Sequence, residues 1–236
     1  MRLILTGCEY SGTTTLAVHT HAWAKDEMGI ELGAIHDHWK IPYTVTHYPE
    51  SITEEEADQY AALAPRLQEA LQRHNLYYHL VAEAAPAGPN RRVGVDGDQM
   101  LVGYHIEDTI YADLYYGYGG PGKAGDRASH SRKIEERIMR LAPETVLVHV
   151  HAAPEAIRSR MRATPHKRPL VSDADVEMVL GRFRDAVAAS AIANKVEIDT
   201  SDAGEAESAQ QIQLALEPFL TDADRQRREQ VAASAG

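Results

Sequence analysis

Short apolar runs alternate along the chain with longer segments in which apolar residues recur at helical spacing. The first run, RLILT at 2–6, is closed by Gly7 and is typical of a strand buried in a parallel sheet. Residues 13–28 then carry Leu16, Trp23 and Met28 in a helical pattern that stops at Gly29. The chain therefore begins with a predicted strand, a glycine-containing loop and a helix.

The alternation of predicted strands and helices continues to the end of the chain. Further strands are predicted at 31–36, 91–96, 145–150 and 195–199, and helices at 51–84, 99–117, 131–141, 154–163, 176–193 and 206–220. The long segment 51–84 starts with Ser51 and Glu54 in capping-box spacing and is expected to kink or split at Pro65. This alternation predicts an α/β fold, a doubly wound five-stranded parallel sheet flanked by helices.

Segments without an apolar pattern set the expected boundaries. We predict one domain over 1–220, a mobile glycine-rich loop at 117–131, a small basic lid at about 163–173, and a disordered tail at 221–236. A hydrophobic content of 44% in 236 residues is ample for one buried core.

Composition narrows the setting in which the protein works. The single cysteine, Cys8, excludes a disulfide framework and fits a reducing compartment, so we expect the cytoplasm. The apolar runs are too short to span a bilayer and the amino-terminal residues lack a signal-peptide cleavage region, so no membrane partner is expected. A net charge of −11 argues against nucleic-acid binding, while small phosphorylated ligands and a homodimer stay open.

The loop GCEYSGTT at 7–14 carries the strongest chemical signal. Gly7 and Gly12 have the spacing of a P-loop, whose backbone N–H groups and helix N-terminus surround phosphate. Thr14 occupies the position whose hydroxyl binds magnesium, but Thr13 stands where the motif has lysine. The alternative is a glycine turn that only starts a helix. The residues expected to bind ATP phosphates are Gly7, Cys8, Glu9, Tyr10, Ser11, Gly12, Thr13, Thr14 and Thr15.

Over about residues 1–220 the chain resembles the P-loop kinases of nucleosides and nucleotides, closest to the thymidylate kinase and deoxynucleoside kinase group. The resemblance rests on LILTGCEYSGTTTLA, VGVDGDQMLVGYHIEDTIYADLYYG and VLVHVHAAPEAIRSRMRATPHKRPL, followed by FRDAVAASAIANKVEIDTSD. It implies an acid-arginine motif in the middle segment, where Asp96 is followed here by Gly97. A second resemblance links HDHWKIP at 36–42 with uridine and nicotinamide riboside kinases, in which an acid of that loop activates the acceptor hydroxyl.

Phosphoryl transfer needs magnesium, cations around the travelling group, and an acid for the acceptor. Asp37, just past the second predicted strand, is the first candidate for general base or metal-associated acid, with His38 and Trp39 beside it to contact substrate. Asp96 is expected to hold magnesium through water, and Asp98 is its competitor. Aspartates that only cap helices or form turns are the alternative for all three.

Glu107, Tyr111 and Tyr115 share one helical face that could line an acceptor pocket, or could simply pack. The concentrated positive charge lies in Arg158, Arg160, Arg162, Lys167 and Arg168. Of these, Arg162, Lys167 and Arg168 are expected to point inward over the nucleotide, although a solvated face is the alternative. Together with Lys40, they are the candidates to replace the missing P-loop lysine.

These observations predict an ATP- and magnesium-dependent kinase acting on a small acceptor, a nucleoside or nucleotide. A catalytically degenerate nucleotide-binding protein is the first alternative. Thr13 stands where the P-loop motif has lysine, and Gly97 follows Asp96 where the resembled family has arginine. A P-loop kinase of another small metabolite is the second alternative.

Overall fold

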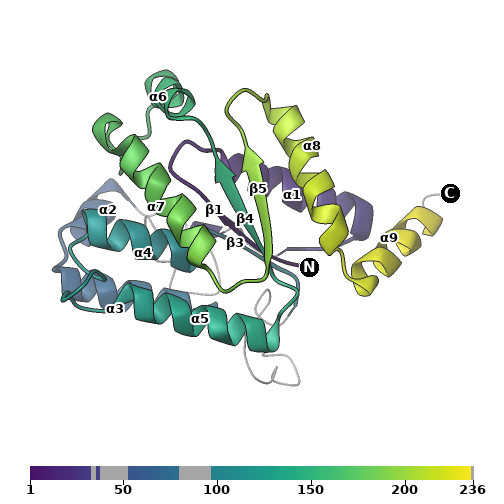
Figure 1. Ribbon diagram of the computed structural model, residues 1–236, viewed down its shortest axis with the longest axis horizontal. Helices are drawn as coiled ribbons and strands as arrows, with labels where there is room; N and C mark the ends of the chain where they lie inside the picture. The colour runs from purple at the N-terminus through teal and green to yellow at the C-terminus, as the bar shows by residue number, and fades with distance from the viewer. Residues whose placement is uncertain (33–35, 38–52, 80–96, 235–236) are drawn as a thin grey trace.

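Four parallel strands form the centre of the computed structural model, which describes residues 1–32, 36–37, 53–79 and 97–234 (Figure 1). They are β1 (Arg2–Thr6), β3 (Gln99–Val102), β4 (Val146–His151) and β5 (Asn194–Asp199), in the order β3-β1-β4-β5. Beside β3, the two residues of β2 (His36–Asp37) pair in parallel. The predicted α/β class with a parallel sheet is confirmed.

Helices cover both faces of this sheet (Figure 1). One face carries α1 (Thr13–Met28) and α8 (Glu205–Leu216), and the other carries α4 (Tyr104–Tyr115), α5 (Arg127–Leu141) and α7 (Val176–Ala189). Strand β1 is buried on both sides. Leu3 and Leu5 pack into the hydrophobic cluster that β1 shares with α1, and Ile4 packs into the cluster that it shares with α4. The remaining elements are α2 (Glu54–Ala61), α3 (Pro65–Tyr78), α6 (Pro154–Ala163), α9 (Asp222–Ser234) and the 3₁₀ turns η1 (Asp173–Asp175) and η2 (Glu217–Phe219).

Several elements lie where the sequence predicts them. Helix α1 spans the predicted residues, and β4, β5 and α6 match their predictions to within one residue. The segment 51–84 is split at Pro65, which opens α3 at a position that tolerates proline. The capping box is formed by Thr53 and Glu56, two residues beyond the predicted pair. The Thr53 hydroxyl accepts the Glu56 N–H at 3.2 Å.

The structure has a strand where the sequence predicts the start of a helix. Residues 91–96 lie outside the described residues, and β3 forms from 99–102, which the apolar pattern assigned to a helix. Pairing with β1, with Gln99 opposite Arg2, decides the conformation of this four-residue run. Asp98 therefore precedes the strand, at the edge of the sheet opposite the phosphate loop. It binds the Met1 ammonium and Arg227, at 2.6 Å from the guanidinium, and is excluded as a magnesium ligand of that loop.

The tail is also different from its prediction. Residues 222–234 form α9, which contacts α1 although it has no apolar stripe. Ion pairs hold it instead: Arg227 reaches Asp98, and Arg228 reaches Glu217 at 2.7 Å. Helix α5 likewise begins inside the predicted mobile loop, where Asp126 caps it by accepting from Ser129 N–H at 3.1 Å.

None of the described helices combines the length and hydrophobicity needed to cross a bilayer.

Candidate phosphate-binding site

The loop from Gly7 to Thr14 joins β1 to α1 at the carboxyl edge of the sheet. A Cβ at position 7 would collide with the carbonyl oxygen of Val150 and lie 2.6 Å from Ser11 Oγ, so only glycine fits there. Gly12 has a φ of 98°, which L side chains rarely adopt. The turn is closed by the Ser11 N–H, which donates to the Cys8 carbonyl at 3.0 Å. Glycine is therefore required at position 7 by the close approach of other atoms, and at position 12 by the backbone conformation.

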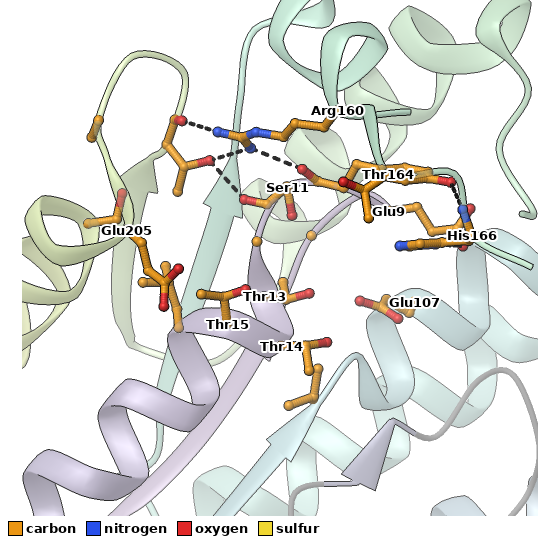
Figure 2. A pocket seen from close by; sticks show the side chains of 18 of the residues that line it. Glu9, Ser11, Thr13, Thr14, Thr15, Glu107, Arg160, Thr164, His166 and Glu205 are labelled. Carbon is orange, nitrogen blue, oxygen red and sulfur yellow. Dashed lines mark hydrogen bonds and ion pairs between the residues drawn. The ribbon is translucent and has the colours of Figure 1, made fainter. Parts of the chain in front are cut away.

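The loop opens onto a cavity of about 480 Å³ (Figure 2). Its walls come from the loop and first turn of α1, from the ends of β3 and β5, and from α4, α6, α8 and the segment after α6. The residues that line it are Gly7, Glu9, Tyr10, Ser11, Gly12, Thr13, Thr14, Thr15, Leu16, Val102, Glu107, Tyr111, Arg160, Thr164, His166, Thr200, Ala203, Glu205 and Ser208. Ligands of open α/β sheets bind at this edge.

The amino end of α1 presents hydrogen-bond donors to the cavity. Among the described residues no side chain caps this helix, and its first turn contains no acid that would neutralise the positive end of the helix dipole. Thr13, Thr14 and Thr15 add three hydroxyls at the same place. The Ser11 hydroxyl is fully buried and has no hydrogen-bond partner within the described part of the chain. This is the arrangement that binds an anion at a helix terminus.

Arg160 fixes the loop to β5. Its guanidinium donates to the Tyr10 carbonyl at 3.0 Å, to the Thr200 hydroxyl at 3.0 Å, and to the Thr200 carbonyl (Figure 2). The Thr200 hydroxyl in turn donates to the Ser11 carbonyl at 2.8 Å. Arg160 lines the cavity, yet its donors are directed at protein carbonyl and hydroxyl oxygens, so its main role in this state is to hold the loop.

Glu9 and Tyr10 connect the loop to the predicted lid. Oε2 of the buried Glu9 carboxylate accepts the N–H groups of Leu170 and Val171 at 2.8 and 3.0 Å, and Oε1 lies 3.1 Å from Nδ1 of His166. The Tyr10 hydroxyl accepts the His166 N–H at 2.8 Å, and the two rings stack with centroids 3.9 Å apart. Side chains of the phosphate loop therefore hold the segment 166–171 against it, which the sequence motif does not indicate.

The lid cations point elsewhere than predicted. Lys167 pairs with Glu54 at 2.5 Å, and Arg168 pairs with Glu54 at 2.9 Å and Asp58 at 2.7 Å, on the exposed helix α2. Arg162 is exposed near the end of α6 and does not line the cavity. The reason is electrostatic. Acids of α2, about 110 residues away in the sequence, attract Lys167 and Arg168 away from the loop at 7–14.

The acidic-aromatic face of α4 is divided between two roles. Glu107 and Tyr111 line the cavity, and the Tyr111 hydroxyl accepts the Glu9 N–H at 3.1 Å, which ties α4 to the loop. Burial raises the pKa of Tyr111 well above its usual value, so the hydroxyl stays protonated. Tyr115 is only half-buried, lies outside the cavity lining, and donates to Asp175 at 3.4 Å.

The other predicted site residues divide as follows. The Cys8 side chain is buried in the core under α4 and α7, and burial raises its pKa to about 12, so it takes no part in the cavity. His38, Trp39, Lys40 and Asp96 lie outside the described residues, and only the backbone of Asp37 is described, in β2. The sequence reading missed Thr200, His166 and Glu205 as lining residues; each is separated from the loop by more than 150 residues and carries no local motif.

No protein family model matches the sequence, and no curated protein is similar to it at a significant level. Solved structures do share its fold. The YorR protein from Bacillus subtilis superposes with a TM-score of 0.55 at 17% identity, covering 94% of this chain and 99% of that one. Deoxyadenosine kinase from M. mycoides superposes with a TM-score of 0.53 at 12% identity, covering 92% of this chain and all of the other. The chain thus has a fold found among nucleoside kinases.

Proposed function

We propose that the protein is an ATP- and magnesium-dependent phosphotransferase acting on a nucleoside, a nucleotide or a similar small acceptor. The observation that carries the proposal is the glycine loop 7–14, which opens onto a cavity of about 480 Å³ at the carboxyl edge of the sheet. Backbone donors, the uncapped end of α1 and the buried Ser11 hydroxyl are suited to a phosphate group. The degenerate P-loop, with Thr13 in place of lysine, is part of this proposal.

The ligands of the two structural relatives support a nucleotide. The YorR structure holds phosphorylated GDP, and the deoxyadenosine kinase structure holds dCTP. In this chain the cavity is large enough for part of such a ligand, and the neighbouring surface of α4 supplies Glu107 and Tyr111 for contacts with an acceptor.

The residues present also fit magnesium. Thr14 is exposed in the first turn of α1, and carboxylate and hydroxyl oxygens line the same cavity. Magnesium is held in kinase sites by one or two such hard oxygen ligands together with waters and substrate phosphates. Bound there, it would neutralise phosphate charge during transfer. Asp37 and Lys40 remain predicted catalytic residues, and Asp96 remains a predicted metal-associated acid.

A catalytically degenerate nucleotide-binding protein is the second candidate, and one observation favours it. Within the described lining, the permanently charged cation is Arg160, whose guanidinium already binds protein oxygens, while Lys167 and Arg168 pair with α2. In addition, the resemblance implies an arginine directly after Asp96, and this sequence has Gly97 there. In this state few cationic side chains are placed to stabilise the phosphoryl group during its transfer.

Two measurements separate these candidates. Calorimetry with ATP·Mg tests binding, and a screen of nucleosides, nucleoside monophosphates and other small alcohols with ATP and Mg²⁺, read by mass, tests transfer. Phosphorylated product that disappears in Lys40→Ala supports the kinase. Binding without product from any acceptor supports the degenerate protein, in which Thr13→Lys should tighten ATP by adding a charge-assisted contact. Absence of ATP binding refutes both.

A further inference from the structure

A charged cluster is buried among α3, α4 and α5, which lie on the same side of the sheet (Figure 1). Its centre is Arg127, the first residue of α5, whose side chain is 1% exposed. Nε of Arg127 lies 2.6 Å from Oδ2 of Asp108 on α4, and Nη1 donates to Oε1 of Glu69 on α3 at 3.2 Å. Nη2 also donates to the Glu69 carbonyl at 3.1 Å. One guanidinium therefore joins two buried carboxylates from two other helices.

The glycine-rich segment 117–126 closes over this cluster. The Arg127 N–H donates to the Gly119 carbonyl at 2.9 Å, and the fully buried Tyr118 ring lies 5.1 Å from the guanidinium carbon. A Cβ at Gly119 would lie 2.4 Å from Cγ of Arg127, and a Cβ at Gly125 would lie 2.4 Å from Cγ of Glu69. Two glycines of the segment thus allow its backbone to approach the buried ions closely.

The two acids do not share positive charge equally. Glu69 has a second guanidinium partner on its solvent side, because Nε of the half-exposed Arg73 lies 3.4 Å from Oε1. In the described part of the chain, Asp108 pairs with Arg127, which it shares with Glu69. A buried carboxylate is stable as an ion when its charge is compensated. Asp108 is therefore the acid of this cluster on which a proton is expected first.

The other titratable groups that face the cluster supply no further positive charge at neutral pH. Burial raises the pKa of Tyr118 and of Tyr60 on α2, so both phenols stay neutral. Burial and the nearby Arg127 lower the pKa of His130 on α5, so its ring is neutral as well. Burial raises the pKa of Asp108 to about 6, although Arg127 opposes the shift.

We propose that Asp108, Arg127 and Glu69 form a proton-binding cluster, which takes up one proton on Asp108 and thereby stabilises the packing of α3 and the segment 117–126 on α4 as the pH falls. Once Asp108 is neutral, it no longer competes with Glu69 for the guanidinium, and one buried carboxylate faces one buried guanidinium. The sign follows from linkage: the folded chain binds this proton more strongly than the unfolded chain, so its uptake adds stability between pH 7.5 and pH 5. This inference is independent of the proposed function.

Urea unfolding of the ligand-free protein at pH 7.5 and pH 5 tests the proposal by comparing the parent with Asp108→Asn, whose side chain is neutral at both values. Relative to that variant, the unfolding equilibrium constant of the parent should fall about tenfold between pH 7.5 and pH 5, as a folded-state pKa of about 6 requires. Groups elsewhere in the chain titrate in both proteins, so their contributions cancel in this comparison.

Asp113→Asn is the matched control. It removes the same charge from the same helix, at a position that pairs with Lys123 at 2.8 Å near the surface. The pH dependence of its unfolding should stay within about threefold of the parent's, as expected for a solvent-exposed ion pair.

Glu69→Gln is the second variant, because it leaves the Arg127 guanidinium to Asp108 alone. Proton uptake should then move below pH 5, and the parent's gain between pH 7.5 and pH 5 should be lost. The proposal is overturned if the parent and Asp108→Asn show the same pH dependence, or if Asp113→Asn loses the gain as well. Where Asp108→Asn fails to fold, a Glu69→Gln protein that keeps the parent's pH dependence overturns it equally.

Discussion

The contact between Glu9 and the lid segment leads to a quantitative prediction. In Glu9→Ala the N–H groups of Leu170 and Val171 lose the carboxylate that accepts them at 2.8 and 3.0 Å. Val171 is 1% exposed, so its N–H has little access to water when the acceptor is removed. The substitution therefore breaks two charge-assisted hydrogen bonds and leaves a buried donor unsatisfied.

The expected loss follows from these two bonds. A hydrogen bond to a charged group contributes about 1.5–3 kcal/mol, and partial relaxation of the segment offsets part of the sum, so the free energy of unfolding should fall by about 2–4 kcal/mol. Glu9→Gln is the matched control, because its carbonyl oxygen can keep both N–H groups while the amide faces His166. It should lose only about 1 kcal/mol.

Urea unfolding followed by circular dichroism measures these differences, and hydrogen exchange of a peptide covering residues 166–172 locates them. Exchange in that peptide should rise in Glu9→Ala and stay near the parent's rate in Glu9→Gln. The reasoning is refuted if Glu9→Ala unfolds within about 0.5 kcal/mol of the parent and its lid segment exchanges at the parent's rate.

Three further predictions concern the loop, a buried histidine and the last helix. Gly7→Ala should weaken ATP more than about tenfold in calorimetry, because the added Cβ displaces the loop from the Val150 carbonyl; unchanged affinity would contradict the phosphate-loop assignment. Burial lowers the pKa of His149 to about 4, so its contribution to stability is complete above its unfolded pKa near 6.5 and is lost as pH falls toward 4. Urea unfolding should show the parent losing about 2 kcal/mol more than His149→Asn between pH 7 and pH 5, and equal losses would show that the ring does not titrate this way. Arg227→Met should cost about 1 kcal/mol and increase exchange in α9, because its ion pair with Asp98 is lost; unaltered exchange would mean that other contacts hold the helix.

Local sequence was sufficient for elements whose pattern is long or clearly bounded. Helix α1 follows from apolar residues at helical spacing ended by Gly29, and α6 follows from a proline at its start. The glycine loop between β1 and α1 was predicted the same way, since its two glycines and its place between strand and helix are all features of neighbouring residues; its phosphate-binding role stays a proposal. These are the cases in which backbone preferences and periodicity act within one segment.

Tertiary structure decided the rest. A run as short as QMLV fits a strand or a helix equally well, and it became β3 because β1 lies beside it. Helix α9 needs Asp98 and Glu217 for its arginines, and the lid cations are directed by Glu54 and Asp58. Ion pairs between residues far apart in the chain leave no periodic pattern, because each depends only on where the fold places the opposite charge. For the same reason the cavity, its acidic wall at Glu107 and the link from Glu9 to the lid emerge only when the elements are assembled.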